Sequence, residues 1–495
     1  MAENMEGVEA TTTTAAMLAE AGMPGFGPDV GYGFNSEKFS NLMLEIEVLA
    51  GGRSGPDSVS NNEEKADKGQ AIDSSSTRAV LAVKTLYINS LILAGRSPFF
   101  LKLFTNGMKE SNETHPRISI ADSEENALME LLRFMYSGKL TTIEPTLLLD
   151  ILMAADKFEV LSCMSHCSQL LTSLPMTTDS ALLYLDHPCS SLIAAEVQSV
   201  VRVAKEFLAD KYKDFHKFEA EVLNISLVGI EAIFSSTDLM LLSEDEAYYF
   251  LLKWVRRRYP ELEERRKIWS CRLLPLVRFS HMTGLSLQRI LACTDDDIVH
   301  EQVAKRIAEV LLYKAYPTQM EGTLAAEVAT HHQFAERTYE LKAVKVVAFD
   351  RPCRQVTVYM DLKRDECSQL FSTGNIASDW FGLGGQKYCL LPNCTLDEQT
   401  NFYTFGLWIV TIGEPTDSVC LTVDIQIAVR TKPLGNFVSM LEYRHEFTGD
   451  DWTAGCNDLF GIPWSTFIDD DTLFIDDVLH LAAILTLVEQ PELQI

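Results

Sequence analysis

The sequence predicts an α+β multidomain protein with a mixed α+β N-terminal part, an all-α middle part and a C-terminal antiparallel β-sandwich. Strand-like stretches followed by amphipathic helices occupy residues 39–171, and residues 172–340 carry helical periodicity almost throughout. From residue 341 the apolar pattern changes to short strand-like segments separated by Gly, Pro, Asn and Asp. Strands followed by a run of helices indicate α+β organisation, and repeated short strands with turn signals indicate a sandwich.

Length, charge and cysteine usage limit the classes of function. A chain of 495 residues corresponds to about two to four domains. A net charge of -28 argues against nucleic-acid binding, which needs a basic surface. The 11 cysteines include no Cys-x-x-Cys pair, which favours reduced thiols over a zinc module. We expect no membrane span, because no apolar run approaches about 18 residues, and no secretory signal in the first residues.

The beginning of the chain divides into a leader, two strands and an insertion. Residues 1–38 are rich in Ala, Thr, Gly, Glu and Pro, and we expect a disordered leader there. Residues 39–49 alternate apolar and polar side chains, as a half-buried strand does, and residues 79–88 return to a strand pattern. The Gly-, Ser- and Asn-rich residues 50–78 between them are predicted to be a flexible insertion.

Residues 86–110 are the stretch around which the chain is organised. A strand leads into a short helix, and Ser97-Pro98 opens a second helix. Serine can accept a hydrogen bond from a free N–H group of the first turn, and proline fits there because its missing N–H would have no partner. Phe100 and Phe104 then share one helix face. The stretch ends in Met108-Lys109-Glu110, which is typical of an interface and not of a catalytic site.

Further elements follow from capping and periodicity. We expect a short strand at residues 117–120, a helix capped by Asp122 with Glu125 at its third position, a helix after Pro145 and another at residues 161–171. Gly138 would end the first of these helices.

In the middle part, Ser243-Glu244-Asp245-Glu246 is predicted to be a full capping box, and Arg256–Arg258 lie near the C-terminus of the same helix. The C-terminal strands are expected at residues 344–349, 355–359, 402–408, 419–425 and 479–485. A turn between strands is expected at the glycines of residues 382–385.

Several polar clusters admit a functional and a structural interpretation. Cys163, His166 and Cys167 could begin a metal site, but no further ligand lies near in sequence, so helix packing is favoured. The aspartates of 469–471 and 476–477 lack the spacing of a calcium loop, which favours a solvated turn. Arg256–Arg258 could serve nuclear import or simply suit a helix C-terminus. No nucleophile, base and orienting acid occur together, so we expect no enzyme and no cofactor.

The stretch Leu86–Phe104 resembles the BTB (POZ) signature, in which a strand, a histidine position and a Leu-Ala pair precede Ser-Pro-Phe-Phe. Asn89 stands where many BTB domains carry histidine, and Asn41 stands where aspartate is usual. The region 172–315 resembles the BACK domain that commonly follows BTB. The phrases that carry this second resemblance are residues 221–227, 233–239 and 243–247.

Longer phrases resemble one plant group, the light-response BTB proteins. These phrases are Ala154–Val160, Ser180–Leu185, Tyr359–Cys367 and Leu459–Trp464. The resemblance implies a BTB/POZ domain at 39–171 with the insertion 50–78, a BACK domain at 172–315, a helical linker at 316–340 and a substrate-binding sandwich at 341–495. The MATH/TRAF type is one candidate for that sandwich.

The resemblance also implies a function. Such proteins are substrate-specific adaptors of cullin-3-based E3 ubiquitin ligases, and they form homodimers or heterodimers with paralogues. Met108 and Glu110 match the apolar-x-Glu motif that contacts the cullin, while Leu91, Leu93, Phe100 and Phe104 would build the BTB core and dimer.

In this group the implied substrates are phytochromes or their partner transcription factors, and the implied location is the nucleus, with the cytoplasm left open. The alternative is a BTB-dimerising scaffold or transcriptional co-regulator that engages no ligase.

Overall fold

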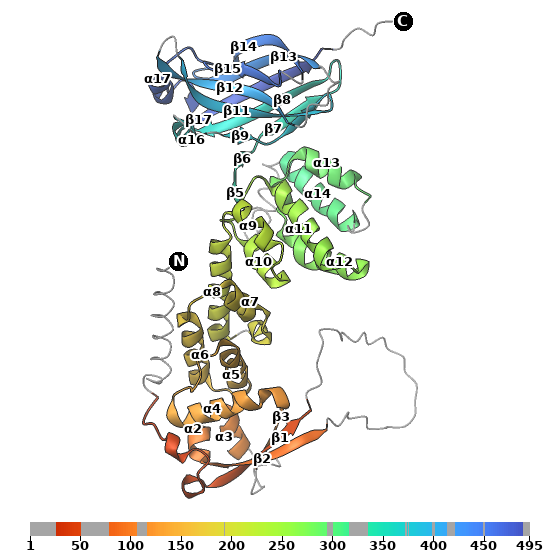
Figure 1. Ribbon diagram of the computed structural model, residues 1–495. Coiled ribbons are helices and arrows are strands. Elements are labelled where there is room, and N and C mark those ends of the chain that lie inside the picture. The colour runs from red at the N-terminus through yellow and green to blue at the C-terminus, as the bar shows by residue number, and fades with distance from the viewer. Residues whose placement is uncertain are drawn as a thin grey trace, which may run out of the picture. The chain divides into compact units, whose positions relative to one another are not determined.

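The structure is a computed structural model (Figure 1). It describes residues 26–50, 79–105, 116–192, 194–294, 300–315, 335–371, 374, 376–397, 401–412, 421–448 and 451–488. The chain divides into two compact units, one spanning 1–211 and 226–232 and the other spanning 212–225 and 233–495. The division falls inside the region 172–315 of the sequence-based prediction, whose domain boundaries stay a prediction. Within the described ranges, no helix has the length and apolar character that crossing a membrane requires.

The first unit contains a three-stranded sheet in the order β2-β1-β3. Strand β1 (Leu42–Leu49) pairs antiparallel with β2 (Val80–Ile88) and parallel with β3 (Arg117–Ala121). Alternate β1 side chains, Leu44 and Ile46 among them, are fully buried because successive residues face opposite sides of a strand. The strands predicted around residues 39–49, 79–88 and 117–120 are therefore confirmed.

Helices complete the first unit. They are α2 (Ser90–Arg96), α3 (Pro98–Thr105), α4 (Glu125–Ser137), α5 (Pro145–Lys157), α6 (Leu161–Ser173), α7 (Thr178–Asp186) and α8 (Ala195–Lys211). Helix α4 ends at Gly138, whose φ of 71° is left-handed, as the sequence predicts. The cap predicted at Asp122 is wrong by one residue. The cap is Ala121, whose N–H group donates a hydrogen bond to the Glu124 carboxylate at 2.8 Å.

The segment from residue 26 packs against α4, which corrects the prediction of a disordered leader up to residue 38. The ring of Phe26 lies 5.0 Å from that of Phe134, and the ring of Phe34 lies 5.6 Å from that of Tyr136. The Val30 N–H group also donates a hydrogen bond to the Tyr136 carbonyl. Aromatic side chains thus offset the ordering entropy of a Gly-rich segment. The rest of the predicted leader, residues 1–25, lies outside the described residues, as does nearly all of the insertion 50–78.

The second unit begins with helices. They are α9 (Phe215–Val222), α11 (Glu244–Arg258), α12 (Leu262–Ile268), α13 (Gly284–Ala292) and α14 (His300–Ala315), while α10 (Leu227–Ser235) straddles the division between the units. The full capping box predicted at the start of α11 is wrong. The Ser243 side chain makes no capping hydrogen bond, and the Glu246 carboxylate accepts from the Leu242 N–H group. Glu244 is completely buried. Its carboxylate therefore interacts with groups outside the predicted capping box.

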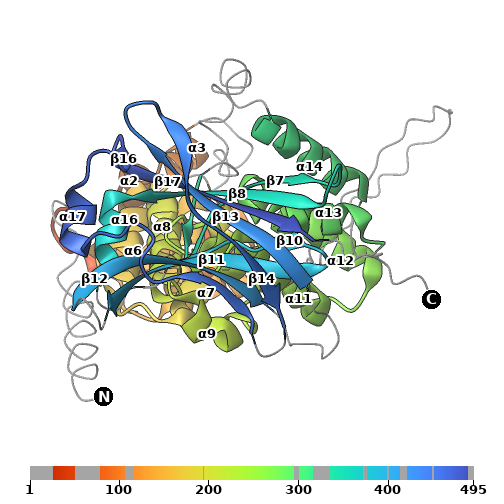
Figure 2. The ribbon, with the colours of Figure 1, turned by 90° about the horizontal axis from the view of Figure 1, so that it is seen from above.

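The C-terminal part is a β-sandwich, as predicted. One sheet has the order β10-β11-β12-β15, and the other has the order β14-β13-β17-β8-β7 with β16 on β17. Figure 2 shows the long strands of both sheets from above. The first sheet contains β10 (Phe381–Leu383), β11 (Gln386–Asp397), β12 (Phe402–Ile412) and β15 (Thr453–Cys456). The second contains β7 (Lys345–Phe349), β8 (Gln355–Lys363), β13 (Leu421–Thr431), β14 (Asn436–Phe447), β16 (Phe474–Ile475) and β17 (Val478–Leu487).

The two sheets share one hydrophobic core. Val358 and Ile425 of one sheet and Leu390 and Leu407 of the other belong to the same buried cluster. All strand pairings within the two sheets are antiparallel. Short helices α16 (Arg364–Gln369) and α17 (Trp464–Asp469) lie at the ends of strands. A MATH/TRAF-type sandwich stays a prediction.

Candidate protein-interaction site

The start of α3 is built as the sequence predicts. The Ser97 hydroxyl accepts a hydrogen bond from the Phe100 N–H group at 3.1 Å and donates one to the Phe158 carbonyl at 2.6 Å. Pro98 is the first residue of the helix. Ser97 is buried, so its hydroxyl both caps α3 and ties this helix to the end of α5.

The inner face of α3 is aromatic. Phe100 is fully buried and stacks on Phe158 with 5.7 Å between ring centroids, and Phe104 stacks on Phe100 at 5.9 Å. Leu93 of the preceding helix α2 is also fully buried, whereas Phe104 is half-buried. Leu93 and Phe100 therefore hold α2 and α3 to the core, and their part in dimer formation stays a prediction.

The outer face of the same region exposes aliphatic side chains. Leu91 is 80% exposed, Leu101 47% and Leu161, at the start of α6, 62%. A groove of about 600 Å³ lies beside α3 and is lined by Leu101, Leu161 and Arg96. The Arg96 guanidinium lies 3.5 Å from the ring centroid of Phe26, which forms another part of the wall. Such an apolar surface with a charged margin suits contact with another protein.

The two asparagines in unusual positions both support the start of α2. The Asn89 side-chain oxygen accepts from the Leu91 N–H group at 3.1 Å, and the Asn41 side-chain oxygen accepts from the Ser90 N–H group at 2.8 Å. The Asn89 N–H group donates to the Tyr136 hydroxyl at 2.7 Å. Burial raises the pKa of this tyrosine, and the Asn89 hydrogen bond partly opposes that effect. Both amides thus have a structural role in orienting α2.

The predicted cullin-contact residues Met108 and Glu110 lie outside the described residues. The structure does place their attachment point, because α3 ends at Thr105 and the next described residue is Pro116, just before β3. The role of Met108 and Glu110 stays a prediction.

Comparison with known proteins identifies the architecture. The model of the BTB/POZ domain family matches residues 74–174. A BTB/POZ domain-containing protein of Arabidopsis thaliana is 47% identical over 418 residues, which cover 84% of this chain and 74% of the relative. The chain belongs to the BTB/POZ domain-containing protein family. A second Arabidopsis member is 41% identical over 426 residues, covering 85% of this chain and 80% of that protein.

More distant BTB proteins are similar over part of the chain. Human Kelch-like protein 17 is 28% identical over 211 residues, 41% of this chain and 30% of that protein. Kelch repeat and BTB domain-containing protein 8 of Danio rerio is 25% identical over 219 residues, 43% of this chain and 34% of that protein. This BTB/POZ protein thus belongs with BTB proteins of the interaction-adaptor type, whose members are generally non-catalytic.

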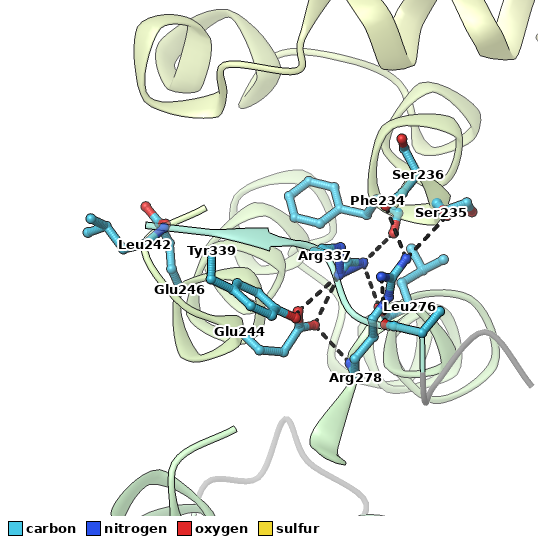
Figure 3. A network of polar contacts seen from close by, with 11 residues as sticks. Phe234, Ser235, Ser236, Leu242, Glu244, Glu246, Leu276, Arg278, Arg337 and Tyr339 are labelled. Carbon is cyan, nitrogen blue, oxygen red and sulfur yellow. Dashed lines mark hydrogen bonds and ion pairs between the residues drawn. The ribbon is translucent and has the colours of Figure 1, made fainter. Parts of the chain in front are cut away.

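The second unit of this BTB/POZ protein contains a buried ionic network that sequence reasoning missed (Figure 3). The carboxylate of Glu244 lies 3.0 Å from the guanidinium of Arg337, and both side chains are inaccessible to solvent. The Tyr339 hydroxyl and the Arg278 N–H group donate to the same carboxylate at 2.7 and 2.8 Å. Because Glu244 and Arg337 are 93 residues apart, no local sequence signal connects them.

The guanidinium groups of the network also satisfy backbone carbonyls. Arg337 donates to the Leu276 carbonyl at 3.0 Å, and Arg278 donates to the Ala335 carbonyl at 2.8 Å. Burial lowers the pKa of Arg278 to about 10, so this side chain stays protonated at neutral pH. Burial, followed by the Glu244 carboxylate, raises the pKa of Tyr339. Each charged side chain of the network therefore has at least one hydrogen-bond partner, as burial requires, although the buried Nε atom of Arg337 donates to no described residue.

The network fixes the extended segment 335–342. Strand β5 (Thr338–Tyr339) pairs in parallel with β4 (Met240–Leu241), and β6 (Leu341–Lys342) pairs with β9 (Ala377–Ser378). The predicted helical linker 316–340 is thus extended at its end, where residues 338–339 form a strand, and residues 316–334 lie outside the described residues.

Two of the clusters with two interpretations make structural contacts, and the role of Arg256–Arg258 stays a prediction. Cys163, His166 and Cys167 are buried in α6, and burial raises the pKa of Cys163 and lowers that of His166. Asp471 and Asp477 form ion pairs with Arg364. Across the described part of the chain, no three His, Cys, Asp or Glu residues are grouped as metal ligands would be.

Proposed function

We propose that this BTB/POZ protein is a substrate-specific adaptor of a cullin-3-based E3 ubiquitin ligase and acts as a dimer. The observation that carries the proposal is the α2–α3 region. Its core is fixed by Ser97 and Phe100, while Leu91 and Leu101 expose apolar surface on α2 and α3, the last described helix before Met108 in the sequence. Similarity to Kelch-like BTB proteins supports the same type of function.

The mechanism that we propose is proximity. Met108 would enter an apolar pocket of the cullin while Glu110 pairs with a basic group at the rim. The second unit, and the sandwich in particular, would bind the target, so that the target is held near the ligase at high effective concentration. A dimeric adaptor would bring two target sites together and add avidity. We place this activity in light signalling, with phytochromes or their partner transcription factors as targets in the nucleus.

The test is a pull-down of purified cullin-3 by the wild type and by the double variant Met108→Glu/Glu110→Ala. We expect the variant to bind at least about tenfold more weakly, which corresponds to about 1.4 kcal/mol. The matched control is Leu434→Glu/Glu442→Ala, which makes the same kinds of change at exposed positions of the sandwich and should bind normally.

Two outcomes would contradict the proposal at different points. Equal binding by the wild type and the Met108/Glu110 variant would refute the assigned contact. Failure of the wild type itself to bind cullin-3 would refute the adaptor role and favour a BTB scaffold or co-regulator without a ligase.

A further inference from the structure

The groove of about 600 Å³ beside α3 has an arginine in its wall. This residue is Arg96, the last residue of α2, and the buried Nη1 atom of its side chain donates to no group among the described residues. The guanidinium lies against the ring of Phe26 instead. Burial lowers the pKa of Arg96, because it disfavours the charged form. A buried donor without a partner favours an acceptor that an occupant of the groove would supply.

The start of α6 also favours negative charge in this groove. This helix of 13 residues begins with Leu161 and Ser162, which both line the groove. The preceding Val160 provides no capping side chain, and the first turn contains no acidic residue, so the helix itself does not offset the positive end of its dipole. The carboxylate of the groove wall, Glu159, is already bound by the Lys102 ammonium at 3.1 and 3.2 Å.

The remaining wall of the groove is largely apolar. It includes Pro98 and the exposed side chains of Leu101 and Leu161. The volume lies in the range of about 300–1,000 Å³ that is typical of binding pockets. The groove therefore fits a short segment that carries aliphatic side chains and one carboxylate.

The chain itself contains a segment of this kind next to the groove. Phe26, the first described residue, forms part of the groove wall, so the preceding residues join the fold at this point. Residues 1–25 include four glutamates and no lysine, arginine or aspartate. Glu20 lies between Leu18 and Met23, and the six residues from Glu20 to Phe26 can span up to about 20 Å. A tethered segment has an effective concentration of about 1 mM at its site, so that weak contacts suffice to fill it.

We propose that residues 17–25 occupy the groove of their own chain. The Glu20 carboxylate accepts hydrogen bonds from Arg96 and from the free N–H groups at the start of α6, while Leu18 and Met23 cover the apolar walls. A partner protein that uses the same walls then has to displace this segment. The inference goes beyond the adaptor function, because it concerns a contact within one chain and requires no ligase.

The experiment is a photo-cross-link in the whole chain. The variant Leu101→p-benzoylphenylalanine places a photoreactive group in the groove wall, and mass spectrometry maps its products. We expect cross-links to residues 17–23 in a product of monomer mass on a denaturing gel. The control Leu434→p-benzoylphenylalanine, at an exposed leucine of the sandwich, should give none to these residues. Products that join two chains, or an absence of cross-links from position 101 to residues 17–23, would overturn the proposal.

Charge reversal tests whether Glu20 and Arg96 hold the segment. Glu20→Arg and Arg96→Glu should each lower the cross-link yield at least about fivefold, because each breaks a charge-assisted hydrogen bond. The double variant should recover most of the yield. The matched control Glu9→Arg reverses a charge outside residues 17–25 and should leave the yield unchanged. Equal yields from Glu20→Arg and Glu9→Arg would overturn the assigned contact, whether or not Arg96→Glu folds.

The apolar part of the contact has its own variant. Leu18→Asp should also lower the cross-link yield, because a charge would then face the apolar wall without a partner. Val8→Asp makes the same kind of change outside residues 17–25 and is the control. Unchanged yield in Leu18→Asp would overturn the assigned packing. All of these yields are measured without cullin-3, so this inference and the adaptor function can fail independently.

Discussion

At the scale of single residues, the Glu244–Arg337 pair shows what burial does to a charge. The first turn of α11 is acidic. Acidic side chains at the start of a helix are commonly exposed, and their interaction with the helix dipole adds only modestly to stability. Here Glu244 is completely buried and has three partners, of which Arg337 and Tyr339 come from a distant segment. Local sequence patterns could not reveal this role, because the pairing depends on the tertiary fold.

Replacing Arg337 tests the energetic role of this pair. We expect Arg337→Met to lower the free energy of unfolding of the second unit by about 3–5 kcal/mol, because Glu244 would stay buried without its counter-charge. Urea titration followed by tryptophan fluorescence measures the change, since Trp254 and Trp269 are buried in the same helical region. The control Arg444→Met breaks an exposed pair with Asp424 and should leave stability unchanged. Equal midpoints for the two variants would contradict the structural role of the pair.

At the scale of elements, strong local signals predicted the fold well. Ser97-Pro98 opens α3, Gly138 ends α4, and the apolar stripe of α4 is buried, as periodicity and capping indicate. Strand β11 was missed because Pro392 lies within it, and proline usually argues against an inner strand. Strand β14 was missed because it is an edge strand with mostly exposed residues, so its apolar alternation is weak.

Gly138 provides the prediction at this scale. Its left-handed backbone disfavours a side chain, and a Cβ atom there would also overlap the ring of Phe26. We expect Gly138→Ala to lower the free energy of unfolding of the first unit by about 1–2 kcal/mol and to release residues 26–34 from α4. Chemical denaturation measures the first effect and limited proteolysis the second.

Gly95 is the matched control for this prediction. It lies in α2, and a Cβ atom there would meet no atom within 4 Å. Gly95→Ala should therefore be neutral or stabilise the unit by up to about 1 kcal/mol. If Gly95→Ala lost as much stability as Gly138→Ala, the packing of residues 26–34 against α4 would not be the cause of the loss in Gly138→Ala.

At the scale of the whole molecule, an adaptor has to combine a stable fold with exposed contact surfaces. Helix α2 shows both requirements two residues apart, because Leu93 is fully buried while Leu91 is 80% exposed. The sequence identified both as apolar positions of one short stretch, but it could not separate core from surface. That separation depends on which face of a seven-residue helix meets the core.

The exposure of Leu91 leads to a prediction about self-association. If the apolar outer face of α2 contributes to the proposed homodimer, Leu91→Asp should convert the dimer to a monomer without unfolding it, because a charge in a dimer core would be desolvated without a partner. Light scattering coupled to size-exclusion chromatography measures the mass, and circular dichroism verifies the fold. Leu434→Asp, at a leucine that is 81% exposed in the sandwich, is the control and should stay dimeric. If Leu91→Asp stays dimeric, the self-association surface lies elsewhere. A further variant, Leu93→Asp, should fail to fold, which would confirm that only Leu91 faces outward.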